Sequence, residues 1–165
     1  SDSANEFKVW KHTLKFLENE ENKPIDMLLS LPATSPLRTK KDVKKCIDMF
    51  FKFQPDLVIT ASIAQRHPNF NIIKLDKKGF AHLFNDNHSS LHRRQDANNA
   101  FDIATVAYAV RPQYIKVASR LMDGNVRAVI IPKERTIDID DLYDFEFAEY
   151  LFQKKHVKSL PKFPR

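Results

Sequence analysis

Helical and strand-like patterns alternate along residues 6–62, and no other feature of the sequence constrains the fold as strongly. Apolar residues recur at helical spacing over 7–17, and a continuous apolar run follows at 25–31. A second helical pattern begins after Thr39, and a second apolar run covers 57–62. Each helical pattern is about four turns long, which is long enough to cross over between two parallel strands. The alternation therefore predicts an α/β domain with a mostly parallel central sheet.

Two local signals mark the beginnings of these helices. Ser3 and Glu6 have the spacing of a capping box before the first helix. Thr39 precedes the second helix, and Asp42 stands three residues later. The apolar stripe of the second helix is expected at Val43, Ile47 and Phe50.

The middle of the chain predicts an insertion in this alternation. Residues 71–75 and 80–84 have the pattern of two hairpin strands, joined by a turn at 76–79. A long stretch rich in Asn, His, Ser and Arg follows. Connections longer than ~15 residues in compact domains are usually functional. We therefore expect an arm over 66–101, inserted in a single domain that spans 1–165.

The remainder of the chain returns to alternating strands and helices. Strand patterns cover 104–110 and 127–131, with a short helical pattern at 113–122 between them. A last helix is expected to begin at Asp140 or Asp141. Its apolar face is predicted at Leu142, Phe145, Ala148 and Phe152.

Composition excludes several classes of site. The chain has two glycines, where average usage of ~7% would give about twelve. Dinucleotide fingerprints and Walker-type phosphate loops both need several glycines, so neither is present. The single cysteine, Cys46, excludes an internal disulfide and a cysteine-based zinc site. A lone thiol fits a reducing, cytoplasmic location.

The charge pattern bears on possible partners. The net charge is +6, but the basic residues are scattered, apart from a basic tail at 154–165. A nucleic-acid-binding stripe with interleaved aromatic residues is missing, so no nucleic-acid partner is expected. No apolar run approaches the ~18 residues of a membrane span, so no membrane partner is expected either.

Two loops are candidates for a site, because ligands of such sheets bind outside the carboxyl ends of the strands. These loops are 32–38 and 132–141. In the second loop, Asp138 and Asp140 are two residues apart, so an extended backbone points both carboxylates to one side, with Cα atoms about 6.6 Å apart. Two such carboxylates fit magnesium, which completes its shell with water and phosphates. The alternative is that these aspartates only cap the last helix.

Other polar groups could bind an anion. Thr34, Ser35 and Arg38 in the first loop carry hydroxyl and guanidinium groups suited to anionic oxygens, although this loop could equally be a turn that caps the next helix. In the arm, Arg93 and Arg94 either grip a carboxylate or phosphate, or are exposed solvated charges. The six histidines show no zinc-ligand spacing.

Three segments, taken in order, resemble one known family. They are Thr34-Ser35-Pro36-Leu37-Arg38, Arg93-Arg94-Gln95-Asp96 and Arg135-Thr136-Ile137-Asp138-Ile139-Asp140. Together they closely resemble the acylneuraminate cytidylyltransferases, also called CMP-sialic acid synthetases. The opening Ser1-Asp2-Ser3-Ala4 is similar to that family's Ser-Asp-Thr-Ala segment. The resemblance covers nearly the whole chain, up to about Phe152.

This resemblance implies a three-layer α/β/α nucleotidyltransferase domain, Rossmann-like, with a mostly parallel sheet and a hairpin dimerisation arm. It implies that a homodimer transfers CMP from CTP to a nine-carbon (nonulosonic) sugar acid and releases pyrophosphate. Asp138 and Asp140 would hold magnesium as the catalytic residues, and Ala4 would line the cytidine pocket. The residues implied to bind the sugar acid are Thr34, Ser35, Arg38, Arg94 and Gln95.

The chain also departs from the family pattern. The Arg-x-Gly-Ser-Lys loop that grips the triphosphate is absent, as is the family's first strand. We therefore expect the sequence to be the C-terminal two-thirds of such a domain, and the isolated chain to be inactive.

Other departures leave the sugar acid open. Pro32 replaces a glutamine of the sugar-binding loop, residues 102–105 replace an Arg-Pro-Asn-Gly segment, and Glu6 stands where a serine is usual. Sialic, legionaminic and pseudaminic acids are equally plausible acceptors. The alternatives are an eight-carbon keto-deoxy sugar acid as the acceptor, or a non-catalytic remnant of the fold.

Overall fold

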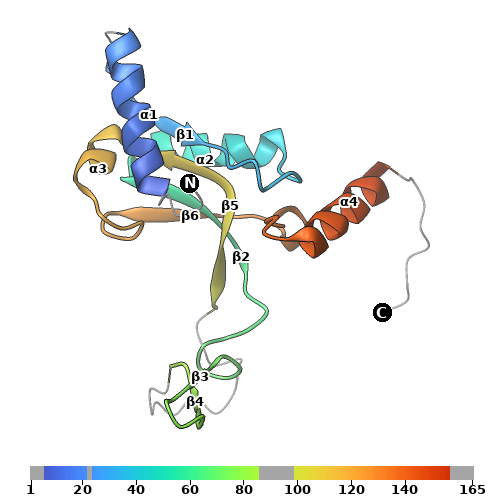
Figure 1. Cartoon of the computed structure of the whole chain (residues 1–165). Helices are drawn as coiled ribbons and strands as arrows, with labels where there is room; N and C mark the ends of the chain where they lie inside the picture. Colours follow the sequence, from blue (N-terminus) through green and yellow to red (C-terminus); the bar gives the residue numbers. More distant parts are fainter. Residues whose placement is uncertain (1–5, 22–23, 86–98, 157–165) are drawn as a thin grey trace.

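The computed structural model describes residues 6–21, 24–85 and 99–156 (Figure 1). Its helices are α1 (Glu6–Glu21), α2 (Lys40–Phe53), α3 (Pro112–Val117) and α4 (Leu142–His156), with a short 3-10 helix, η2 (Lys133–Arg135). Its strands are β1 (Leu28–Ser30), β2 (Leu57–Ile63), β3 (Ile73–Leu75), β4 (Ala81–Leu83), β5 (Phe101–Val110) and β6 (Val126–Ile130). Each helix and strand that the sequence predicts is present.

Four strands form the central sheet, in the order β1-β5-β2-β6. β2 and β6 pair in parallel, whereas β5 runs antiparallel to both of its neighbours, β1 and β2. Three strands therefore share one direction, as predicted for a mostly parallel sheet, and β5 runs against them. Because β1 and β6 point the same way, the loops that follow them leave the sheet at the same edge.

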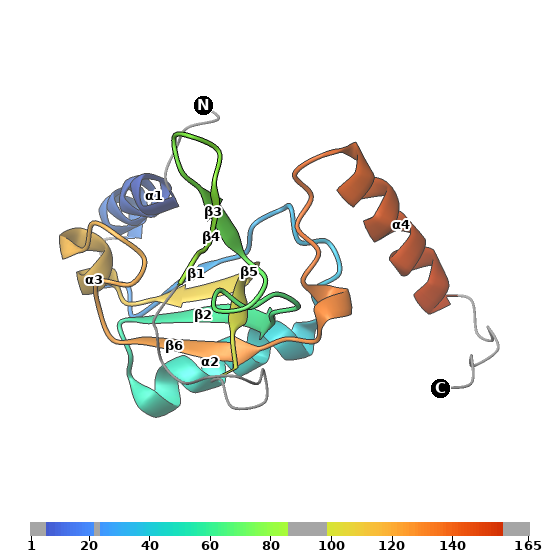
Figure 2. The same cartoon turned by 90° about the horizontal axis from the view of Figure 1, so that it is seen from below.

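Helices cover both faces of this sheet and complete three layers (Figure 2). Successive side chains of a strand point to opposite faces, so the apolar run at the start of β2 supplies both cores. The core beneath α1 and α3 contains Trp10, Leu14, Leu57, Ile59, Tyr108 and Ile115. The core beneath α2 contains Cys46, Phe50, Val58, Val106 and Val129.

The buried face of α2 differs from the prediction. Phe50 is buried as predicted, but Val43 and Ile47 are only partly buried. Asp42 instead faces inward, because its carboxylate both caps the helix and pairs with Arg135. The buried face of α2 therefore runs through Asp42, Cys46 and Phe50, and Val43 and Ile47 lie at its border.

The helix predicted at 113–122 is shorter than expected and ends at Val117. Ala118 is extended, with φ −71° and ψ 150°. The Asp123 carboxylate then accepts a hydrogen bond of 2.9 Å from the backbone N–H of Arg120. This side-chain acceptor stabilises a turn in place of the last helical turn.

The hairpin predicted in the arm is confirmed, and it projects from the end of the β2–β5 pair, away from the helices (Figure 1). β3 and β4 pair antiparallel, with Ile73 opposite Leu83. In the turn, the Asp76 carboxylate accepts hydrogen bonds from two backbone N–H groups, and Gly79 adopts φ +86°. Residues 86–98 of the arm lie outside the described residues.

Within the described ranges, no helix combines the length and the apolar character that crossing a membrane would need.

Candidate functional site

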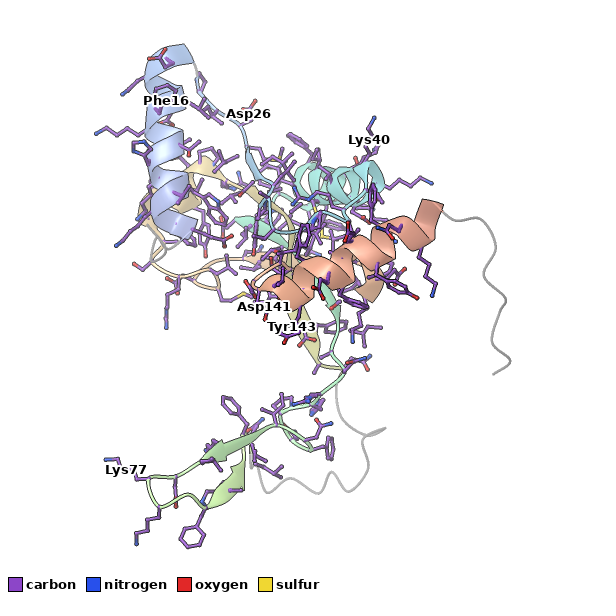
Figure 3. All side chains as sticks on the ribbon, turned by 45° about the vertical axis from the view of Figure 1, so that its right-hand side comes forward. Phe16, Asp26, Lys40, Lys77, Asp141 and Tyr143 are labelled. Carbon is purple, nitrogen blue, oxygen red and sulfur yellow. The ribbon has the colours of Figure 1, made fainter. Side chains whose placement is uncertain are left out.

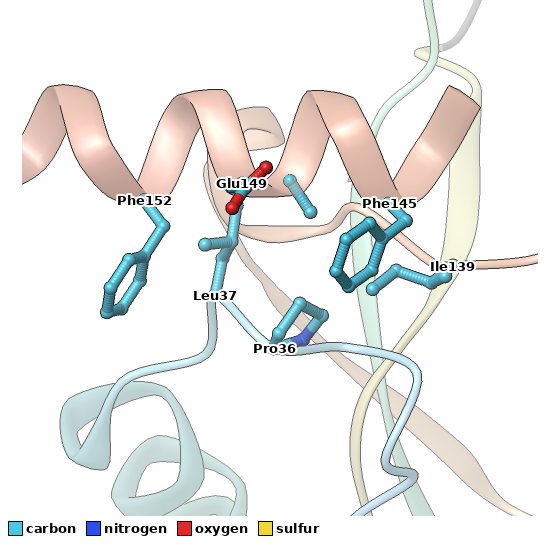
Figure 4. A pocket seen from close by; sticks show the side chains of 7 residues that line it. Pro36, Leu37, Ile139, Phe145, Glu149 and Phe152 are labelled. Carbon is cyan, nitrogen blue, oxygen red and sulfur yellow. The ribbon is translucent and has the colours of Figure 1, made fainter. Parts of the chain in front are cut away.

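The structure brings together the two loops singled out in the sequence. The backbone N–H of Ile139 donates a 2.9 Å hydrogen bond to the carbonyl of Thr34, so the loops 32–38 and 132–141 lie side by side. The side chain of Ile139 turns inward, beneath α4 and toward Leu37 (Figure 4). The candidate site is therefore built at one edge of the sheet.

An ion pair between Arg135 and Asp42 anchors the second loop to α2. Nε and Nη2 of Arg135 each lie 2.8 Å from a carboxylate oxygen of Asp42, whose side chain is 1% exposed. The same carboxylate accepts hydrogen bonds from the backbone and the hydroxyl of Thr39, in the predicted capping box. Burial raises the pKa of Asp42, but the hydrogen bonds from Arg135 and Thr39 outweigh it and lower the pKa to about 2.

The two hydroxyl groups of the first loop have different surroundings. Ser35 is fully buried, and its Oγ lies 2.7 Å from Oγ1 of Thr105 in β5. Thr34 is exposed. The hydroxyl of Ser35, one of the residues predicted to bind substrate, joins the loop to the sheet, and Thr34 is the exposed residue of this pair.

Arg38 closes the first loop on itself by donating a hydrogen bond to the carbonyl of Pro32. Burial lowers the pKa of its guanidinium. Its Nε is buried and has no hydrogen-bond partner within the described ranges. Leaving such a donor unpaired costs free energy, so an anionic acceptor at this atom would be stabilised.

The aspartates of the second loop differ in their burial and in their hydrogen bonds. Oδ1 of Asp138 is buried and has no hydrogen-bond partner in the described part of the chain, whereas Asp140 is exposed. The cap of α4 comes instead from Asp141, whose carboxylate accepts a 3.0 Å hydrogen bond from the backbone N–H of Asp144. The helix-cap alternative therefore holds for Asp141, which leaves the carboxylates of Asp138 and Asp140 free of that role.

The described residues of this site do not form a closed protein cage for a metal ion. Among the described residues, no group of three or more His, Cys, Asp or Glu side chains is arranged to hold a metal. Magnesium usually binds one or two carboxylates and takes its other ligands from water and substrate phosphates. The unpartnered Asp138 oxygen is an acceptor that such a cation would satisfy.

Glu6 and Tyr108 join Asp138 in a cluster that the sequence analysis did not identify. Burial, followed by the charge of Asp138, raises the pKa of Glu6, and a hydrogen bond from Tyr108 acts in the opposite direction. Burial and these two carboxylates also raise the pKa of Tyr108, which keeps its hydroxyl protonated. The available signal was a tyrosine between alanines in the apolar second half of β5 and a glutamate beside the apolar stripe of the first helix.

Several predicted positions lie outside the described residues. They are Ala4, Arg94, Gln95 and Ser3, the last belonging to the predicted capping box of the first helix.

An apolar pocket of about 210 Å³ lies beneath α4 and beside the loop 32–38 (Figure 4). Its lining residues are Pro36, Leu37, Ile139, Phe145, Ala148, Glu149 and Phe152. Three of the four positions predicted for the apolar face of α4 are among them. The fourth, Leu142, is 69% exposed and does not line the pocket, so the prediction for this residue is wrong; Phe145 and Phe152 line the pocket but remain about half exposed.

Comparisons with known proteins identify relatives, although no protein-family model matches the chain. Post-translational flagellin modification protein B of Campylobacter coli is 26% identical over 159 residues, or 96% of the chain. Two Campylobacter jejuni proteins, a pseudaminic acid cytidylyltransferase and a CMP-N,N'-diacetyllegionaminic acid synthase, are 23% and 24% identical over 94% and 95% of the chain. The chain spans 66% of the length of each of these relatives.

Among solved structures, a CMP:2-keto-3-deoxy-manno-octonic acid synthetase complexed with CTP matches with a TM-score of 0.56. The match covers 86% of this chain and 67% of that one, at 12% identity. At this identity the likeness concerns the fold alone, and it confirms the predicted α/β fold class.

Proposed function

We propose, from the relationship of the chain to the sugar-acid cytidylyltransferases in sequence and in fold, that it transfers CMP from CTP to a nonulosonic sugar acid. In this reaction the anomeric hydroxyl of the sugar acid releases its proton to the solvent and attacks the α-phosphorus of CTP. The bond from that phosphorus to the bridging oxygen breaks, and pyrophosphate leaves. Two of the relatives are named for pseudaminic and diacetyllegionaminic acids, which favours a nine-carbon acceptor of this type.

The observation that carries this proposal is the unpartnered carboxylate oxygen of Asp138, at the junction of the two loops. In the proposed site, Asp138 and Asp140 hold a magnesium ion. When bound, that ion neutralises charge on the triphosphate and so favours displacement at phosphorus.

Residues of the first loop bind the acceptor in this proposal. The exposed hydroxyl of Thr34 and the guanidinium of Arg38 orient the sugar acid through its anionic and hydroxyl oxygens. Ser35 holds the loop in place through Thr105.

The remaining roles are assigned to residues outside the described ranges. Ala4 lines the cytidine pocket, and Arg94 with Gln95 reaches the sugar acid. We propose that the arm carries Arg94 to the site of a second subunit in a homodimer. Arginine suits this role because its two parallel N–H groups match a carboxylate.

The acceptor can be tested with a protein that contains these 165 residues. It is incubated with CTP, magnesium and one of four acids: pseudaminic, diacetyllegionaminic, N-acetylneuraminic or 2-keto-3-deoxy-manno-octonic acid. Pyrophosphate release and CMP-sugar formation are both measured. We expect both products with at least one nine-carbon acid.

Two other results would support the alternative functions, an eight-carbon acceptor or a non-catalytic remnant of the fold. Turnover with the eight-carbon acid alone would make the chain a cytidylyltransferase for that acceptor. Absence of turnover with all four acids, together with absence of CTP binding in calorimetric titration, would identify a non-catalytic remnant of the fold.

A further inference from the structure

The last helix, α4, is apolar on more than one side. Phe145, Ala148 and Phe152 line the apolar pocket beside the loop 32–38 (Figure 4), where Ala148 is buried and the two rings remain 52% and 54% exposed. The rest of the helix extends away from the sheet (Figures 1 and 2). An amphipathic surface helix needs one covered side, so a second apolar side calls for a second contact surface.

That second side carries a regular stripe of side chains. At ~100° per residue, Tyr143, Phe147, Tyr150 and Lys154 fall within roughly 60° of one another, opposite the side that faces the pocket. The three rings are 82%, 49% and 52% exposed. Figure 3 shows Tyr143 near the beginning of α4, beside Asp141. We refer to these four residues as the outer stripe.

The outer stripe is complementary to itself when two copies of the helix run antiparallel. Tyr143 and Phe147 are four residues apart, as are Tyr150 and Lys154, so a two-fold axis between Phe147 and Tyr150 brings both pairs into register. It places Phe147 opposite Tyr150 of the second copy, and Tyr143 opposite its Lys154. The ammonium of Lys154 already lies 5.5 Å from the ring centroid of Tyr150, so this side chain lies along the stripe and favours an aromatic neighbour.

A parallel arrangement lacks this complementarity. It would bring Lys154 against the same residue of the second copy, and like charges in contact repel. The geometry points to a single occupant: we propose that the outer stripe of α4 binds the outer stripe of a second copy of this chain, antiparallel and two-fold symmetric. This interface is separate from the arm and does not rest on the proposed reaction.

The size of the stripe sets the expected strength of this contact. An aromatic side chain buries ~150–250 Å², so six rings that are between about half and four-fifths exposed remove roughly 700 Å² from water. A stable interface usually buries more than ~1,000 Å². We therefore expect reversible association, with a dissociation constant on the order of micromolar or weaker.

A charge-exchange experiment tests the arrangement, with sedimentation velocity over a concentration series as the readout. Phe147→Glu places a carboxylate against an aromatic ring and should weaken association at least tenfold. Tyr150→Lys alone should weaken association less, because its ammonium group would lie against the ring of Phe147 in the second copy. The double variant, Phe147→Glu with Tyr150→Lys, should restore association, because an antiparallel pair sets each new carboxylate opposite a new ammonium group.

Phe16→Glu on α1 is the matched control, because Phe16 is 57% exposed and lies outside α4 (Figure 3). It should leave association unchanged. If the arm also links two copies, the wild-type chain should form tetramers through both contacts. The same variants should then reduce these tetramers to dimers, rather than dimers to monomers. The proposal is overturned if Phe147→Glu leaves the mass unchanged at every concentration, or if the double variant fails to recover association lost in the single ones.

Discussion

At the scale of single residues, Asp42 connects α2 with the loop that contains Arg135 and Asp138. Its carboxylate caps α2 through Thr39 and holds Arg135, 93 residues further along the chain. Through Arg135 it fixes the beginning of the loop that carries Asp138. The capping role was visible in the sequence because it depends on a spacing of three residues, whereas the ion pair is a long-range contact.

Asp42→Asn should lower the free energy of unfolding by about 3 kcal/mol at pH 7, because Arg135 loses its buried counter-charge. The pKa of Asp42 falls from its ordinary value of 3.8 to about 2 on folding. Its contribution is therefore fully present above about pH 4 and is lost as the pH falls toward 2. In urea unfolding experiments, the difference in the free energy of unfolding between wild type and variant should narrow as the pH falls from about 4 to about 2.

Asp48→Asn is the control for this experiment, because Asp48 forms an exposed pair with Lys44. It should change the free energy of unfolding by less than ~1 kcal/mol. If the free energies of unfolding of wild type and Asp42→Asn differ by the same amount from neutral pH down to about pH 2, the role assigned to the ion pair is contradicted.

The carboxylates of Asp138 and Asp140 make a second prediction at this scale. In an active protein that contains this chain, Asp140→Asn or Asp138→Asn should lower turnover by roughly a hundredfold and weaken the response to magnesium, because a charged ligand is lost. Steady-state rates against magnesium concentration measure both effects. Asp141→Asn is the matched control, since asparagine also caps helices and α4 should remain intact. Wild-type rates in both Asp138→Asn and Asp140→Asn would show that these carboxylates do not hold a catalytic magnesium ion.

At the scale of elements, the hairpin arm exposes more apolar surface than its own two strands can cover. Its exposed apolar side chains are Ile73, Leu75, Phe80 and Phe84, between 57% and 66% exposed. Such a surface usually marks an interaction site. The base of the arm is closed by a 3.0 Å hydrogen bond from the backbone N–H of Ala64 to the carbonyl of Ala100, so the sheet can end there without the arm.

Replacing residues 66–99 by a short turn should therefore halve the measured mass of the assembly, because the proposed arm contact between subunits is removed. Light scattering measures the mass, and circular dichroism checks that the sheet and helices remain folded. An unchanged mass in a folded variant would show that the arm does not join subunits.

At the scale of the whole molecule, the proposed arm contact makes each site depend on two chains. Arg94→Ala and Asp140→Asn should each inactivate an active homodimer that contains this chain. Mixing the two variants should restore part of the activity, because a mixed dimer contains one site with neither lesion. If mixed dimers form and no activity returns, Arg94 does not serve the partner's site. Each variant alone, carried through the same mixing procedure, is the control.

What the sequence determined is local. Apolar periodicity predicts each α-helix and strand, though not the end of α3 or the 3-10 helix η2, because burial of a helix or strand face repeats over a few residues. The cap at Thr39 and the turn at Asp76 follow from side chains that bind backbone groups two to four residues away. The meeting of the two loops was also predictable, since strands that share a direction end at one edge of the sheet.

Only the tertiary structure decided the contacts between distant segments. The direction of β5, the burial of Ser35 against Thr105 and the ion pair of Arg135 with Asp42 depend on chain packing, and local periodicity carries no information about them. Chain packing also brings Glu6, Tyr108 and Asp138 close together. A carboxylate far along the chain changes the ionisation of another because electrostatic interactions depend on distance in space, and only the folded chain sets that distance.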